Sequence, residues 1–248
     1  MARKTFLAFS CVHRPLHDEK ACDWLVKEIE TRQPDYIVNL GDMFDGACLS
    51  TFEKTGDESE LMEEYESTGE LLQRIKDARP RAKRVWMMGN HEQRMFRPFH
   101  AKLSGLIDYR KQIKEAKAWE HRPYKYSPTE TYQLGQVSFY HGFTAGRGTV
   151  KSESVKLGVP YGLTVSGHTH RPHPVHRISM GVTPLPYWML NVGTLIGKCD
   201  YMATKDDSLW GQALAFGNVD PNVRHAGRQH WEAEMVLRRM LWDVGGAA

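Results

Sequence analysis

The chain has 248 residues and a formal net charge of +3, with 41% hydrophobic and 25% charged residues. This length suffices for one large α/β domain with a two-layer core, and the composition is that of a globular protein. The net positive charge is too small to indicate a nucleic-acid binder by itself, although it does not oppose an anionic substrate. The 4 cysteines lack CxxC spacing, which argues against a zinc ribbon and against a disulfide framework.

The first expected element is a strand from Phe6 to Phe9, and it runs into the polar segment from Ser10 to His13. The basic start before this strand imitates a signal peptide, but the apolar run of about five residues is shorter than the roughly 7–15 such a signal needs. No stretch approaches the roughly 18–20 apolar residues of a membrane span. We therefore expect a cytoplasmic protein that makes no membrane contact.

Amphipathic spacing predicts a helix from Glu19 to Thr31, and an apolar strand follows from Tyr36 to Leu40. A strand, a helix and a second strand in this order are the mark of a parallel pair. The second strand stops at Gly41, and two carboxylates follow at Asp42 and Asp45. Carboxylates after a glycine turn at the end of a strand suit ligand binding, although taken alone they are more often simple turn residues.

A long helix is expected from about Asp57 to Ala78; its acidic first half and basic end complement the helix dipole, which favours a structural role for the acidic run. The next expected strand, Arg84 to Met88, leads into Gly89-Asn90-His91-Glu92, and a helical stretch is expected from Glu92 to about Ala118. Aromatic and basic side chains alternate from Trp119 to Tyr126. Such a mixture suits stacking on nucleobases, but a packed connecting loop is the favoured interpretation.

Two elements in the second half of the chain end in histidines. A hairpin of strands over residues 131–134 and 137–140 leads into His141, and the apolar strand from Leu163 to Val165 is followed by His168 and His170. The other expected elements are a helix from Thr149 to Leu157 and strands from Tyr187 to Val192 and from Trp231 to Trp242. Because no repeat or linker is visible, we expect a single domain over residues 1–248, with the motifs within about 5–195 and a C-terminal strand and tail over 196–248.

Six potential metal ligands follow the ends of the expected strands: His13, Asp42, Asn90, His141, His168 and His170. Imidazole nitrogens together with carboxylate oxygens suit manganese, iron or zinc and disfavour calcium. Six groups exceed the three or four protein ligands of one catalytic zinc site, whereas two ions bridged by one carboxylate would use them all. A pair of such ions activates a water and binds both the attacking and the leaving oxygen of a phosphoryl displacement. Any one of these histidines alone would be more simply structural, so the prediction rests on the set.

In order and spacing, this series resembles the calcineurin-like metallophosphoesterase family. The motifs that carry the resemblance are His13, Gly41-Asp42-x-x-Asp45, Gly89-Asn90-His91-Glu92, His141-Gly142 and Gly167-His168-x-His170. The resemblance spans roughly residues 5–195. It implies an α/β fold of four layers (α/β/β/α), in which two mixed β-sheets pack face to face and are flanked by helices. It also implies a phosphoester substrate and two divalent metal ions, manganese, iron or zinc, that activate a water.

The resemblance further implies a role for each matching residue. It makes Asp42 the bridge between the ions and assigns the other metal ligands: His13 and His170 to the first metal, and Asn90, His141 and His168 to the second. It makes His91 the acid near the leaving-group oxygen, oriented by Asp45. Arg94 and Arg171 would hold the substrate phosphate.

The chain departs from the family at one ligand position. The family's first motif is Asp-x-His, usually within Ser-Asp-x-His, and this chain reads Ser10-Cys11-Val12-His13. Cys11 would bind metal as a thiolate, which is softer than a carboxylate and forms a longer bond, about 2.3 Å to zinc. We therefore expect the first metal site to prefer zinc, to bind weakly or to stand empty.

The leading prediction is a metal-dependent phosphoester hydrolase that acts on a nucleotide or nucleic acid. The substrate part of this prediction rests on the segment from Trp119 to Tyr126 and on Arg94 and Arg97. A protein phosphatase is an alternative, since fold and motifs do not separate these substrates. The other alternative is a degenerate, non-catalytic module that binds phosphate or a partner protein, which Cys11 favours. The sequence leaves the oligomeric state open.

Overall fold

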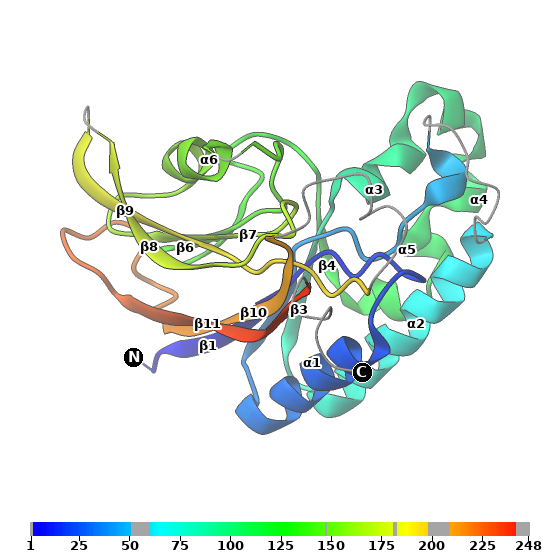
Figure 1. Ribbon diagram of the computed structural model, residues 1–248, viewed down its shortest axis with the longest axis horizontal. Helices are drawn as coiled ribbons and strands as arrows, with labels where there is room; N and C mark the ends of the chain where they lie inside the picture. Colours follow the sequence, from blue (N-terminus) through cyan, green and yellow to red (C-terminus); the bar gives the residue numbers. More distant parts are fainter. Residues whose placement is uncertain (1, 51–59, 147, 181–182, 198–208, 242–248) are drawn as a thin grey trace.

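The computed structural model describes residues 2–50, 60–146, 148–180, 183–197 and 209–241. It contains two β-sheets that lie against each other, with helices on their outer sides (Figure 1). The first sheet consists, in spatial order, of β11 (Trp231–Met240), β10 (Gly211–Val219), β1 (Lys4–Phe9), β2 (Tyr36–Asn39), β3 (Lys83–Met87) and β4 (Glu120–Arg122). The second consists of β5 (Tyr132–Leu134), β6 (Val137–Phe139), β7 (Leu163–Ser166), β9 (Thr183–Asn191) and β8 (His173–Met180). The predicted four-layer α/β fold is confirmed.

Both sheets are mixed, as predicted. Strands β1 to β4 are parallel, whereas β10 pairs antiparallel with β1 and with β11. In the second sheet β6, β7 and β9 are parallel, and β5 and β8 are antiparallel additions at its two edges. Because parallel strands end at the same edge, the residues that follow β1, β2 and β3 gather on one side of the first sheet. The residues that follow β6 and β7 gather in the same way on the second.

Side chains that alternate along β1 fill two separate cores. Phe6 and Ala8 belong to the layer between the two sheets, where Phe6 packs edge-on against Phe139 of β6 with ring centroids 5.2 Å apart. Leu7 and Phe9 belong to the core on the other face of the sheet. This division follows from the two-residue repeat of a strand, which sends neighbouring side chains to opposite faces.

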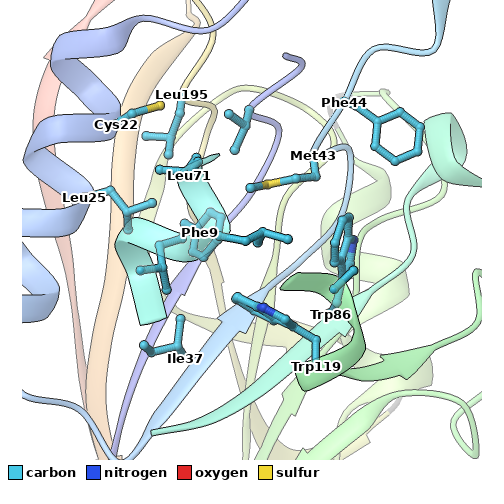
Figure 2. Close-up of a cluster of buried hydrophobic side chains, with 14 of the residues drawn as sticks. Phe9, Cys22, Leu25, Ile37, Met43, Phe44, Leu71, Trp86, Trp119 and Leu195 are labelled. Atoms are coloured by element: carbon cyan, nitrogen blue, oxygen red, sulfur yellow. The ribbon is translucent and has the colours of Figure 1, made fainter. Parts of the chain in front are cut away.

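The core beneath the first sheet is covered by α1 (Glu19–Arg32) and α2 (Leu61–Ala78) (Figures 1 and 2). Figure 2 shows Leu25 of α1 and Leu71 of α2 close to Phe9, with Trp86 and Trp119 on the other side of the cluster. Over the second sheet, α6 (Thr149–Leu157) packs on β7 and β9. The helix predicted from Thr149 is confirmed at both ends, whereas the expected start of α2 at Asp57 lies outside the described residues.

One predicted helix is wrong. The stretch from Glu92 to Ala118 is not continuous but a series of short helices: α3 (Asn90–Gln93), η2 (Arg94–Phe96), η3 (Pro98–Leu103), α4 (Ser104–Ile107), α5 (Tyr109–Gln112) and η4 (Glu115–Ala118). Pro98 cannot donate a backbone hydrogen bond and so interrupts the helix. Asp108 then caps a new helix, because its side chain accepts a hydrogen bond from the Arg110 backbone N–H.

Three strands were not predicted: β4, β8 and β10. The sequence of β10 contains Gly211 and Gly217, and glycine is a poor strand residue. A side chain at Gly217 would lie 2.4 Å from the Glu232 carbonyl oxygen and 2.6 Å from the Phe6 ring, so this strand needs a glycine where β11 and Phe6 approach. Among the described residues, no helix has the length and apolar character required to cross a membrane.

Candidate metal centre

The six predicted metal ligands come together where strands of both sheets end. His13 follows β1, Asp42 follows β2 and Asn90 begins the short helix after β3. His141 follows β6, while His168 and His170 follow β7. Five of them line one cavity of about 160 Å³, which also contacts residues that sequence reasoning did not single out. The full lining is His13, Asp42, Asn90, His91, Ala145, His168, Thr169, His170, Arg171 and Trp210.

The backbone at this site adopts a conformation that side chains other than glycine rarely take. Of the seven non-glycine residues with positive φ in the described part of the chain, five belong to the predicted metal ligands: Cys11 (54°), His13 (51°), Asp42 (54°), His168 (67°) and His170 (59°). Residues held in the left-handed region cost conformational energy and cluster at functional sites. The site is also crowded at Gly89, where only glycine fits, because a Cβ there would lie 2.1 Å from Asp42 Oδ1.

The predicted ligands of the second metal surround the Nε2 atom of His141. This atom lies 3.0 Å from Asp42 Oδ2, 3.1 Å from Asn90 Oδ1 and 3.2 Å from His168 Nδ1. The other ring nitrogen, Nδ1, lies 2.8 Å from the carbonyl oxygen of Leu40, which can only accept a hydrogen bond. In the neutral imidazole Nδ1 therefore carries the proton and Nε2 presents a lone pair. Oxygen and nitrogen atoms of four side chains thus converge, an arrangement that suits a bound cation.

The predicted ligand atoms of the first metal also lie close together. His13 Nδ1 lies 3.1 Å from the Asp45 carboxylate, so it is the donor nitrogen, and the free Nε2 lies 3.1 Å from His170 Nε2. The fully buried sulfur of Cys11 lies within 4.8 Å of ligand atoms of both histidines. It accepts a hydrogen bond of 3.3 Å from the backbone N–H of His168. The structure therefore brings the Cys11 sulfur close to two of the predicted first-site ligands.

Burial, followed by the negative charge of Asp42, raises the pKa of the Cys11 thiol well above its ordinary value. Without a cation beside it, this cysteine is a neutral thiol. A coordinating metal deprotonates such a thiol outright, so binding at this site would release a proton. The affinity of the first site should accordingly increase with pH.

The predicted acid, His91, lies between Asp45 and Arg94. Its Nδ1 is 2.5 Å from the Asp45 carbonyl oxygen and 3.2 Å from the Asp45 carboxylate. Its Nε2 is 3.2 Å from Arg94 Nη2 and 4.0 Å from Asp42 Oδ2. Burial lowers the pKa of His91, but the charges of Asp42 and Asp45 outweigh burial and raise the pKa overall. A raised pKa suits a residue that must hold a proton before donating it.

The two predicted phosphate-binding arginines occupy different settings. Arg94 donates hydrogen bonds to the carbonyl oxygens of Asp45 (2.7 Å) and Gly46 (3.2 Å), which fixes its guanidinium beside His91. Arg171 lines the cavity directly. Both cations lie next to the cluster, but only Arg171 forms part of the described cavity wall.

Sequence reasoning missed the role of Glu92. This fully buried carboxylate accepts backbone N–H groups from Asp42 (3.0 Å), Met43 (2.8 Å) and Gly89 (2.8 Å). It ties the turn that carries Asp42 to the turn that carries Asn90, and so holds two predicted ligands in register. A buried charge surrounded by N–H donors is the one signal that would have identified it, and that signal is structural.

The aromatic and basic segment from Trp119 to Tyr126 divides between core and surface. Trp119 is 5% exposed and packs on Trp86, so the packed-loop interpretation is correct for this part. Tyr124 lies nearer the site, with its ring edge-on to His141 at a centroid distance of 5.8 Å. Tyr126 is 41% exposed.

Two face-to-face sheets with imidazole and carboxylate groups at their strand ends define an α/β sandwich protein with a candidate two-metal centre. The family model of the calcineurin-like phosphoesterases matches residues 4–172, well over half of the chain. The chain belongs to this family. Metal-dependent phosphoester hydrolysis is the activity that membership supports in general.

Solved structures with similar folds include proteins named as a phosphoesterase and a phosphatase, and one named as a vacuolar sorting protein. The phosphoesterase Yfce from E. coli is 13% identical, with 87% of this chain and 88% of that chain covered and a TM-score of 0.46. Vacuolar Protein Sorting 29 from Cryptosporidium parvum is 14% identical, with 95% and 99% covered and a TM-score of 0.45. A phosphatase from Mycoplasma pneumoniae is 13% identical, with 96% and 94% covered and a TM-score of 0.43. Identity and TM-score are too low to carry an activity over to this chain. No curated protein sequence matches it.

Proposed function

We propose that the protein hydrolyses phosphoesters with the help of two divalent metal ions, and that its substrate is a nucleotide or a nucleic-acid phosphoester. One observation carries the proposal: Asp42 Oδ2 lies between two imidazoles, 3.0 Å from His141 Nε2 and 3.8 Å from His13 Nε2. A carboxylate between two groups of nitrogen ligands is the arrangement needed to bridge two ions.

The residues present fit such a pair of ions. Asp42 would bridge them, with these ligands beside it: Cys11, His13 and His170 for the first, and Asn90, His141 and His168 for the second. The approach of Asp42, Asn90 and His168 to His141 Nε2 supports this assignment, since oxygen and imidazole nitrogen atoms are suitable ligands for these metals. When bound, the ions would polarise the phosphoryl oxygens and lower the pKa of the attacking water.

The protein's own groups would handle the leaving group. His91 Nε2 accepts from Arg94 at 3.2 Å in this structure, so it would take up its proton once Arg94 turns to the phosphate, and would give that proton to the leaving-group oxygen as the P–O bond breaks. The Asp45 carbonyl and carboxylate would keep Nδ1 as the other donor and stabilise the charged ring. General acid catalysis of this kind contributes about 10²–10⁴-fold. Arg94 and Arg171 would pair with the phosphate oxygens, as arginine does in many phosphate sites.

The nucleotide part of the proposal is supported by aromatic groups beside the second-site ligands. Tyr124 and Phe143 stack with centroids 4.7 Å apart, and Tyr126 packs edge-on to Phe143 at 5.0 Å. The Lys156 ammonium lies 4.3 Å from the centre of the Tyr126 ring. Aromatic rings combined with cations favour bases and phosphates together.

A second candidate function is a module that binds phosphate or a partner without catalysis. The observation that favours it is Cys11, a ligand that replaces the family's usual aspartate.

A substrate panel separates the two functions. Metal-free protein, reconstituted with manganese, should hydrolyse p-nitrophenyl phosphate, bis-(p-nitrophenyl) phosphate, a nucleoside monophosphate or a dinucleotide. The rate should fall at least about 10²-fold in Asp42→Asn. Protein that binds manganese and cleaves none of the four supports the non-catalytic module. Cleavage of only the nitrophenyl esters would support a phosphoester hydrolase but would contradict a nucleotide or nucleic-acid substrate.

A further inference from the structure

His170 is held differently from His13 and His141 of the candidate metal centre. His13 is fixed by Asp45 at 3.1 Å, and His141 by the Leu40 carbonyl at 2.8 Å. The Nδ1 atom of His170 is buried and has no hydrogen-bond partner among the described residues. A histidine that binds a metal normally donates its second ring N–H to an acceptor that fixes the ring. Some other contact must therefore orient His170.

That contact is the indole of Trp210. The two rings are nearly perpendicular, at 79°, with centroids 4.2 Å apart. His13 packs on the same imidazole, with centroids 5.0 Å apart at 76°. Edge-to-face pairs of aromatic rings have a preferred geometry, so the indole restricts rotation of the imidazole. Trp210 is 5% exposed and also lines the cavity.

The backbone reinforces this contact from both sides. The N–H of Gly211, next to Trp210, donates a hydrogen bond of 3.0 Å to the His170 carbonyl oxygen. The carbonyl oxygen of Trp210 accepts a bond of 2.8 Å from Leu241, and the indole packs in a small buried cluster with Ile196 and Leu241. The support for His170 thus comes from the C-terminal strands, beyond the residues 4–172 that the family model matches.

We infer that Trp210 is a positioning residue that fixes the His170 imidazole for binding of the first metal ion, in place of a hydrogen bond. The inference rests on the proposed function in one respect, the presence of a metal at the first site. It predicts that the two metals depend differently on Trp210, because the second-site ligand His141 is fixed by the Leu40 carbonyl rather than by the indole.

The test is a calorimetric titration of the chelator-stripped full chain with Mn²⁺, in the wild type and in two variants. Trp210→Leu removes the ring, and Trp210→Phe keeps one. We expect Trp210→Leu to weaken one of two binding steps by about 10–100-fold, as loss of an outer-sphere contact does, and Trp210→Phe to restore most of the affinity. The same titration in Asn90→Ala, which lacks a second-site ligand, should retain the step that Trp210→Leu weakens.

A matched control is Trp231→Leu. Trp231 is 2% exposed and packs edge-on to Trp188, so this variant loses the same buried ring without touching the site. It should leave both binding steps unchanged even if it lowers the melting temperature. Equal weakening in the two tryptophan variants, or wild-type affinities in Trp210→Leu, would overturn the inference. If Trp210→Leu does not fold, Trp210→Met is judged by the same criteria. Wild-type protein that binds no metal would overturn the proposed function as well, which makes the two failures distinguishable.

Discussion

The Asp45 carboxylate lies 3.1 Å from Nδ1 of His13, a contact that the family resemblance did not indicate. The same oxygen, Oδ1, lies 3.2 Å from Nδ1 of His91. Burial raises the pKa of Asp45, but hydrogen bonding from these two histidines, and their charge when protonated, outweigh burial and hold the pKa well below its usual range. Asp45 therefore stays ionised, and it supports both a candidate metal ligand and the candidate acid.

Replacing Asp45 should impair both functions at once. We expect Asp45→Asn to weaken the first metal by about 10–100-fold, the usual cost of removing an outer-sphere partner, and also to lower the hydrolysis rate at saturating metal. Metal titration and initial rates with excess manganese measure the two effects separately. Unchanged metal affinity with reduced activity would restrict Asp45 to the orientation of His91.

Removing the candidate acid should matter most when the leaving group is poor. His91→Ala should lose about 10²–10⁴-fold on an alkyl phosphate, because an alkoxide needs a proton to depart. The loss should be much smaller on a nitrophenyl ester, whose leaving group is stable as an anion. Initial rates on the two substrates, together with the metal content of the variant, give the answer. Equal losses combined with lost metal would make His91 structural.

The cysteine at the first site should determine which metal binds there. If the Cys11 thiolate is a ligand, Cys11→Ser removes an anionic ligand and lowers first-site occupancy, whereas Cys11→Asp should raise manganese affinity and hydrolysis. The measurement is metal stoichiometry per chain for the wild type and both variants, with zinc and with manganese. One ion per chain in all three, at unchanged rates, would exclude position 11 from the ligands.

Acid should weaken the link between the first helix and the C-terminal strands. Burial raises the pKa of Asp18, but hydrogen bonding from Gln212 and the charges of Arg238 and Arg239 outweigh it and lower the pKa. Since folding lowers this pKa, ionised Asp18 stabilises the protein above the unfolded-state value of about 3.9, and this contribution is lost as the pH falls through the folded-state pKa.

The variant Asp18→Asn tests the contribution of the Asp18 charge to stability, because asparagine keeps the helix cap and removes the charge. The difference in free energy of unfolding between wild type and variant, measured by urea denaturation, should be constant from about pH 7 to 5 and shrink below about pH 4. A difference that stays the same in acid would mean that the charge of Asp18 contributes nothing.

The sequence predicted the elements that place the site because their signals are local. Each buried strand that precedes a ligand is a short apolar run ended by a polar turn, and the helix starting at Glu19 has its capping aspartate directly before it. The strand β8 was missed because polar and charged residues interrupt its apolar pattern, and β10 because its glycines fit a contact with Phe6 that no local pattern reports.

Site residues that act through distant contacts were equally invisible in the sequence. Trp210 touches His170 only because β10 pairs with β1 at the other end of the chain. Glu92 was read as part of a motif, yet its role depends on the N–H groups of another turn. Ligand types and their order can thus be read from local motifs, whereas the groups that hold the ligands in place depend on tertiary packing.

Metal ions held by Asp42 and the surrounding histidines are proposed here to be required for phosphoester hydrolysis. The most direct measurement is the rate of bis-(p-nitrophenyl) phosphate hydrolysis by chelator-stripped protein as manganese is added back, for the wild type and for Asp42→Asn. We expect no activity without metal, recovery that follows occupancy of two sites in the wild type, and at least about 10²-fold less activity in the variant. Full activity in chelator, or an Asp42→Asn variant as active as the wild type, would contradict this proposal.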